Sequence, residues 1–113
     1  MRIKSSEAKS KTNSEACTVK EYEFPFKKLG IATAIINGRY PDSGKVINRV
    51  CDEIYYVVSG NGVVHTEDGN FKITKGDAFY LEKSKEYWVE GNNLKIVLPT
   101  APSWFQEQYE QLG

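Results

Sequence analysis

The carboxylate of Glu53 is the group in this sequence best suited to chemistry, because it stands at the head of a dense apolar strand, residues 54–58. A carboxylate inside a core needs a partner, since an unpaired buried charge is costly. Arg49, four residues earlier, and the hydroxyl of Tyr87 are the candidate partners. Such a cluster suits a small polar or anionic ligand, because the planar guanidinium group of arginine matches carboxylates and phosphates. The alternative is a purely structural ion pair.

Three other residue types have side chains that could take part in a site. His65 is the only histidine, and it is a candidate general base or pocket-wall residue because histidine titrates near neutrality. Its alternative role is that of a partly exposed strand residue. The rings of residues 55, 56, 79, 80 and 88 alternate along strands, so about half should face inward, mostly as ordinary core. Tyr55 is the ring that we expect to contact a ligand. The two cysteines, Cys17 and Cys51, are interpreted as free thiols in a reducing compartment, and Cys51 as an inert small apolar residue.

The composition limits the possible partners. Fifteen basic and fifteen acidic residues cancel, so no charge surplus indicates nucleic acid or an anionic membrane. No secretory signal is present, and no apolar run approaches the roughly 18 residues that span a bilayer. These features predict a single-domain cytoplasmic protein that binds neither nucleic acid nor membrane.

The elements that would position these side chains are short strands. Apolar, β-branched segments recur at about 8–12-residue spacing and are separated by glycine turns, which is typical of a sandwich or barrel. The sequence predicts strands near residues 31–36, 45–50, 53–58, 63–67, 70–74, 78–81, 87–91 and 94–98. It also predicts tight turns at residues 59–62 and at 91–93, where glycine and asparagine cluster.

The two ends of the chain have a different character. Residues 1–16 are polar and have little to bury, which predicts a mobile tail, although this tail could dock as an added strand in a dimer. Residues 17–113 form the single folded domain. Ser103 with Gln106 three residues later has the form of a helix capping box, and apolar residues follow at helical spacing. We therefore predict a short amphipathic C-terminal helix at about residues 103–112.

The chain from about residue 30 to 99 resembles the small single-domain cupins. Cupins carry one motif that ends in Glu, six residues and Gly, and Glu53 and Gly60 match this half of it. A second cupin motif begins with a Gly that Gly76, followed by DAFYL, matches. The resemblance implies an all-β double-stranded β-helix, or jelly-roll barrel, with a ligand cavity inside, Glu53 facing that cavity, and a homodimer.

The metal ligands of the cupin motifs are replaced in this sequence. The two motif histidines of the first motif fall on Val46 and Asn48, or on Ile47 and Arg49, depending on the spacing. The motif histidine of the second falls on Tyr87. Of the three histidines and one glutamate, the resemblance retains only Glu53. A transition metal needs about three converging ligands, so we expect no tightly bound metal and no cofactor. Weak divalent binding with help from Asn48, Tyr87 or Cys51 stays open.

The sequence therefore leads to one main hypothesis for function and two alternatives. The main hypothesis is a cupin-like protein that binds a small polar or anionic molecule in its barrel through the ligand-binding candidates Asn48, Arg49, Glu53, Tyr55 and Tyr87. The first alternative resembles the metal-independent cupin isomerases and epimerases that act on sugar-type substrates. It would use Glu53 or His65 as the base and Tyr87 as the acid. The second alternative is a metal-binding cupin with atypical ligands.

Overall fold

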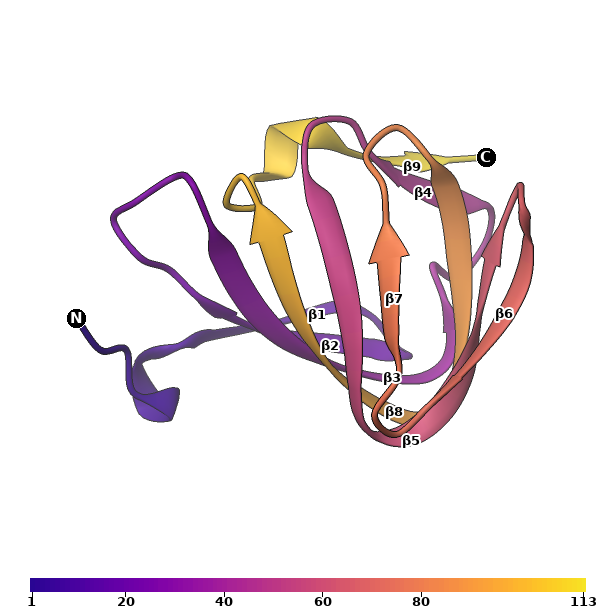
Figure 1. The fold of residues 1–113 in the computed structure, drawn as a ribbon, viewed down its shortest axis with the longest axis horizontal. Helices are drawn as coiled ribbons and strands as arrows, with labels where there is room; N and C mark the ends of the chain where they lie inside the picture. The colour runs from indigo at the N-terminus through magenta and orange to yellow at the C-terminus, as the bar shows by residue number, and fades with distance from the viewer.

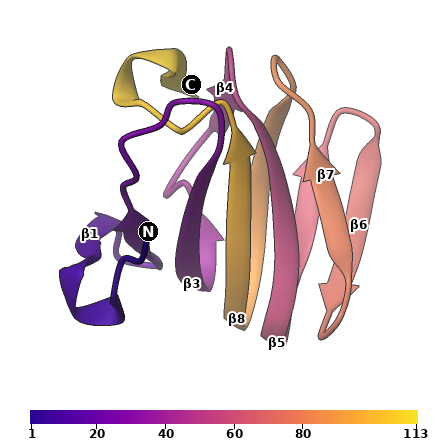
Figure 2. The same ribbon diagram turned by 60° about the vertical axis from the view of Figure 1, so that its left-hand side comes forward.

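The computed structural model describes residues 1–113 and consists almost entirely of antiparallel β-strands. The strands form one sheet that curls on itself into a half-barrel, as Figures 1 and 2 show. None of the chain's helices has the length and apolar composition needed to span a bilayer. The elements in chain order are η1 (Ser5–Glu7), β1 (Lys9–Ser14), β2 (Cys17–Tyr22), β3 (Gly30–Tyr40), β4 (Lys45–Asn48), β5 (Asp52–Thr66), β6 (Gly69–Thr74), β7 (Ala78–Leu81), β8 (Glu86–Ala101), η2 (Gln106–Gln108) and β9 (Tyr109–Leu112).

The central strands β5 and β8 hold the sheet together. Along one path the strand order is β1-β2-β3-β8-β4-β9, while β5 pairs with β6, β7 and β8. The predicted all-β barrel-like architecture is confirmed. Side chains that alternate to the inner face form the core, because successive residues of a strand point to opposite sides. Fully buried aliphatic residues of this core include Ile36, Val57, Val89 and Leu94.

The two predicted glycine turns at residues 59–62 and 91–93 are wrong. Both segments lie inside long bent strands, β5 and β8, which pair with each other through the bend. Gly60 has a φ of 76°, and the pairing register of β5 with β8 shifts between Val57 and Ser59 and again between Ser59 and Asn61. These glycines therefore let two strands bend together and continue from one side of the barrel to the other, instead of reversing the chain.

The N-terminal segment also differs from its prediction. Residues 9–14 form β1, which is paired along its length with β2, where an unstructured tail was expected. The sequence predicted a tail because the segment has little apolar surface to bury. Its backbone instead completes the hydrogen bonds of β2, and its two inward side chains, Lys11 and Asn13, face the interior.

The predicted C-terminal helix is replaced by a single 3₁₀ turn, η2, followed by strand β9. The strand pairs with β4, from Lys45 opposite Leu112 to Asn48 opposite Tyr109. The edge of β4 offers backbone hydrogen bonds to residues 109–112. These bonds outweigh the weak helix preference of such a short segment. This pairing carries the C-terminal segment across one end of the barrel, at the top of Figure 1.

Candidate functional site

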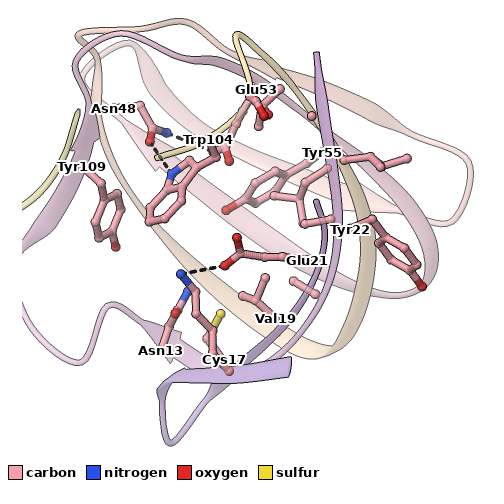
Figure 3. A pocket seen from close by; sticks show the side chains of 18 of the residues that line it. Asn13, Cys17, Val19, Glu21, Tyr22, Asn48, Glu53, Tyr55, Trp104 and Tyr109 are labelled. Atoms are coloured by element: carbon pink, nitrogen blue, oxygen red, sulfur yellow. Dashed lines mark hydrogen bonds and ion pairs between the residues drawn. The ribbon is translucent and has the colours of Figure 1, made fainter. Parts of the chain in front are cut away.

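A cavity of about 280 Å³ lies against the inner face of the curled sheet. Its walls come from strands far apart in sequence: β1 and β2, β3 along its length, the last residue of β4, the start of β5, and β8. The C-terminal segment supplies Trp104 and Tyr109. Figure 3 shows Asn48, Glu53 and Trp104 on one side, with Asn13, Cys17 and Glu21 on the β1–β2 side. This volume is near the lower end for a ligand pocket, so it suits a small metabolite.

Glu53 is the buried carboxyl group of this cavity. It is the second residue of β5, and only 7% of it is exposed. The amide Nδ2 of Asn48 donates to Oε1 at 3.1 Å, and the hydroxyl of Tyr87 donates to the same oxygen at 3.3 Å. Burial raises the pKa of Glu53 to about 7, although both hydrogen bonds oppose the shift. The carboxyl group therefore changes its charge near neutral pH.

The side-chain amide of Asn48 has a fixed orientation. Its Oδ1 accepts a hydrogen bond from Nε2 of Gln108 at 2.8 Å and another from Nε1 of Trp104 at 3.2 Å. Oε1 of Gln108 is itself held by two backbone amides of the loop after β4. With its oxygen occupied, Asn48 can only present its NH₂ group to Glu53. The C-terminal segment thus orients a residue that contacts the carboxyl group.

Arg49 does not belong to this cluster, so the predicted Arg49–Glu53–Tyr87 arrangement is wrong in one member. Arg49 follows directly after the buried Asn48, and its side chain is exposed. Its Nε lies 2.9 Å from Oε2 of Glu110, with which it forms a surface ion pair. The neutral side chain of Asn48, and not the charged side chain of Arg49, lies beside Glu53.

His65 also lies away from the cavity and is not among the residues that line it. Its ring stacks on Trp88 with a centroid distance of 3.7 Å, and its Nδ1 lies 2.7 Å from Oδ1 of Asn70. The prediction of His65 as a base in the site is therefore wrong. Its position on the distal half of β5, twelve residues after Glu53, places it on another part of the bent strand.

Tyr55 and Tyr87 both line the cavity, and their role in binding a ligand stays a prediction. Both are buried, and their rings meet edge to face with centroids 6.4 Å apart. Burial is the main cause that raises the pKa of each phenol well above its ordinary value. They are therefore neutral at physiological pH, and Tyr87 acts toward Glu53 as a hydrogen-bond donor.

Sequence reasoning missed the wall opposite Glu53. Nζ of Lys11 pairs with Oε1 of Glu21 at 2.7 Å and lies 4.2 Å from the ring centroid of Trp104. This contact connects β1 to the C-terminal segment across the cavity. Lys11 was assigned to an unstructured tail and Trp104 to a helix, so neither was considered. The one sequence feature that could have predicted this strand is the two-residue spacing of Lys11 and Asn13, which both line the cavity.

The residues present do not fit the metal that cupin motifs usually hold. No group of three His, Cys, Asp or Glu side chains converges anywhere in the structure. The neighbours of Glu53, Asn48 and Tyr87, are neutral, and the nearby thiol of Cys17 is a poor ligand because burial raises its pKa to about 12. This donor set supplies one carboxylate where about three ligands are needed.

Comparison of the sequence with known proteins finds a relative but no family. No protein-family model matches the sequence. The uncharacterized protein MJ1618 of Methanocaldococcus jannaschii is 26% identical over 100 residues, which cover 83% of this chain and 80% of that protein.

Among solved structures, Pac13, a nucleoside dehydratase, superposes with a TM-score of 0.87 at 16% identity, over 99% of this chain and 90% of that one. KdgF from Halomonas sp. superposes with a TM-score of 0.70 at 17% identity, over 88% and 92%. Bacillus subtilis oxalate decarboxylase superposes with a TM-score of 0.82 at 15% identity, and this chain spans 32% of its length. At these identities the similarity establishes the fold.

Proposed function

The chain has a cupin fold, and we propose that its barrel cavity binds a small polar molecule without a tightly bound metal ion. The observation that carries this proposal is the buried carboxyl group of Glu53, whose protein partners are the neutral donors Asn48 and Tyr87. A buried carboxyl group without a counter-ion is costly to maintain, and core positions are normally apolar. Its retention beside a cavity of about 280 Å³ favours a role in contacting a ligand.

The geometry indicates how such a ligand would be held. Glu53 and Tyr55 come from β5 and Tyr87 from β8, so they lie on rigid, paired strands. The rings of Tyr55, Tyr109 and Trp104 supply apolar wall, and the polar groups of Asn48 and Glu53 supply direction. An apolar wall with a few fixed polar groups is the usual composition of a small-molecule site.

A ligand panel followed by thermal unfolding tests the proposal. The panel contains uridine, which was bound in structures of the similar Pac13, oxalate, and small neutral polyols. A ligand present at 100 times its Kd stabilises the folded state by about 2.7 kcal/mol, which raises the Tm of a domain of this size by roughly 10 °C. Glu53→Gln and Tyr55→Phe should reduce the rise. If no polar compound shifts the Tm, the proposal fails.

An isomerase or epimerase activity on a sugar-type substrate is the second candidate. It is favoured by the pKa of Glu53, raised to about 7, because a general acid–base is most effective when it titrates near the working pH. Glu53 is its base and Tyr87 its acid, since His65 lies elsewhere. The test is exchange of a carbon-bound substrate hydrogen with deuterium from D₂O, followed by NMR. Exchange by the wild type but not by Glu53→Gln supports this activity, and absence of exchange from every sugar that binds contradicts it.

A further inference from the structure

The two oxygen atoms of the Glu53 carboxyl group have different surroundings. Oε1 accepts the hydrogen bonds from both Asn48 and Tyr87, at 3.1 and 3.3 Å. Oε2 accepts no hydrogen bond from the protein. Because a carboxylate has acceptor capacity on both oxygens, half of this capacity is unused. Oε2 is therefore the atom of Glu53 that is left for a ligand.

Thr100 supplies a second unused polar group beside it. In the β5–β8 ladder Thr100 stands directly opposite Glu53, and it lines the same cavity. It is only 5% exposed, and its Oγ1 is buried without any hydrogen-bond partner. A buried hydroxyl left unpaired costs about 1–3 kcal/mol. A partner from outside the protein would remove this cost.

Gly30 allows the threonine hydroxyl to approach the backbone of β3 closely. It stands opposite Thr100 on the other side of β8 and also lines the cavity. A Cβ atom at residue 30 would lie 2.7 Å from Oγ1 of Thr100 and 3.0 Å from Cα of Ser103. The backbone of Gly30 is not in the left-handed region, so glycine is needed here for room. Three adjacent strands thus line one part of the cavity with a glycine, a hydroxyl and a carboxyl oxygen.

We propose that the ligand contacts Glu53 and Thr100 through two neighbouring hydroxyl groups of a neutral ring, so that its chemical class is that of a sugar or related cyclic diol. Side chains directly opposite in an antiparallel ladder have Cβ atoms roughly 4.5–5.5 Å apart. Hydroxyls on adjacent carbons can each reach one of these groups. A hydroxyl both donates and accepts, so it satisfies Oε2 in either protonation state and Oγ1 as well.

An anionic group is a poorer partner at this point. It would have to lie against the Glu53 carboxyl group whenever that group is ionised, and like charges in a buried site repel strongly. The aromatic wall of Trp104 and Tyr109 suits the apolar face of a ring. The inference rests on the proposed function and deepens it by naming the class of ligand.

Two ring compounds that differ in one hydroxyl group test the proposal. The probes are 1,4-anhydroerythritol, a five-membered ring with adjacent cis hydroxyls, and 3-hydroxytetrahydrofuran, the same ring with one hydroxyl. Their binding to the full chain is measured by titration of ¹⁵N-labelled protein, which detects millimolar affinity, and oxalate is titrated as an anionic probe. We expect the diol to bind at least tenfold more tightly than the mono-ol.

The variant Thr100→Val replaces the hydroxyl with a methyl group of similar size, and Thr100→Ser retains a hydroxyl. Because Oγ1 has no protein partner, Thr100→Val should fold with unchanged or higher stability while its affinity for the diol falls to that for the mono-ol. Thr100→Ser should keep the preference. Equal binding of the two ring compounds by the wild type, or an unchanged preference in Thr100→Val, overturns the inference.

The failure of this inference is distinguishable from failure of the proposed function. If oxalate or another compound of the thermal panel binds the cavity while the cyclic diol does not, the diol inference is overturned and the proposed function stands. If no compound of either panel binds, both are overturned.

Discussion

Glu53 is a buried carboxyl group whose partners in the protein are neutral, and this combination has a consequence for stability. The pKa of Glu53 is raised to about 7, chiefly by burial. The folded state therefore holds a proton that the unfolded state releases at a lower pH. Stability is greatest below the unfolded pKa, near 4.5, and falls as the pH rises through 7.

The substitution Glu53→Gln should remove this pH dependence. Glutamine has the same shape and keeps an acceptor for Asn48 and Tyr87, but it has no charge to bury. Between pH 4.5 and pH 8 the wild type should lose roughly 3 kcal/mol of unfolding free energy relative to the variant, as 1.36 kcal/mol per pKa unit requires. Urea unfolding at both pH values measures the difference. The exposed Glu110→Gln is the control, and a wild-type-minus-variant difference that stays constant with pH would contradict the expectation.

The partner of Glu53 depends on a one-residue difference in the alignment of the motif. Asn48 and Arg49 were both candidates, because the motif spacing allowed either register. Successive residues of an extended chain point in opposite directions, so only one could face inward. The structure places the amide inside and the guanidinium group on the surface, paired with Glu110. This changes the site from a charged cluster to one with a single ionisable carboxyl group.

At the scale of elements, the bent strands β5 and β8 shape the cavity wall. At the bend Gly60 meets the backbone of β8: a Cβ atom at residue 60 would lie 2.0 Å from the carbonyl oxygen of Asn93. Gly76, in the turn before β7, has a similar positive φ of 89°, but no atom lies within 4 Å of a Cβ placed there. Both glycines have a left-handed backbone, but only Gly60 has atoms close to the position of a Cβ. Comparing the two therefore distinguishes the cost of backbone strain from the cost of a steric clash.

Alanine substitution at these two glycines should therefore give different costs. Gly76→Ala adds only the strain of a left-handed alanine, about 1–2 kcal/mol. Gly60→Ala adds a backbone clash to the same strain and should cost at least about 2 kcal/mol more, as overpacking of a core does. Chemical unfolding at constant pH measures both. Equal losses of stability in the two variants would show that the contact at the bend is not tight.

At the scale of the whole molecule, one outer sheet face carries several exposed apolar side chains. Ile35 on β3 and Ile54, Tyr56 and Val58 on β5 are 38–46% exposed, and these strands lie on either side of β8. Exposed apolar side chains that share one face are candidates for a protein–protein interface. The sequence-based expectation of a homodimer remains a prediction, and this face is where we expect the two copies to meet.

We expect sedimentation velocity to give the mass of two chains at tens of micromolar protein. Tyr56→Lys should shift the protein to a monomer without altering its circular dichroism spectrum, because a buried unpaired charge opposes the interface. Phe26→Lys is the matched control, since Phe26 is 60% exposed and lies in the loop between β2 and β3. A wild-type monomer at these concentrations would contradict the prediction, as would an unaffected Tyr56→Lys dimer.

The donor set of the whole chain also makes a prediction about metals. With no converging group of three His, Cys, Asp or Glu side chains, the barrel should hold no stoichiometric transition metal. Elemental analysis of protein purified without chelator should find well under one metal ion per chain. EDTA should change neither the Tm nor the binding of any ligand found in the thermal panel. One equivalent of a single metal, together with loss of stability in EDTA, would instead support a metal site with atypical ligands.

The sequence by itself determined the all-β class, since short alternating apolar strands are local features, and the resemblance of Glu53, Gly60 and Gly76 to the cupin motifs indicated the barrel. It also indicated Asn48, Tyr55 and Tyr87, which line the cavity. Only the tertiary structure decided the partners of Glu53 and the opposite wall of the cavity. Trp104 and Gln108 reach Asn48 across 56 and 60 residues of sequence, and Thr100 faces Glu53 through the pairing of β5 with β8. These contacts depend on strand register and on backbone partners that the polar ends of the chain find in β2 and β4. Such long-range pairing leaves no local pattern, because the hydrogen bonds that fix it are made by the main chain, which is the same for every residue except proline.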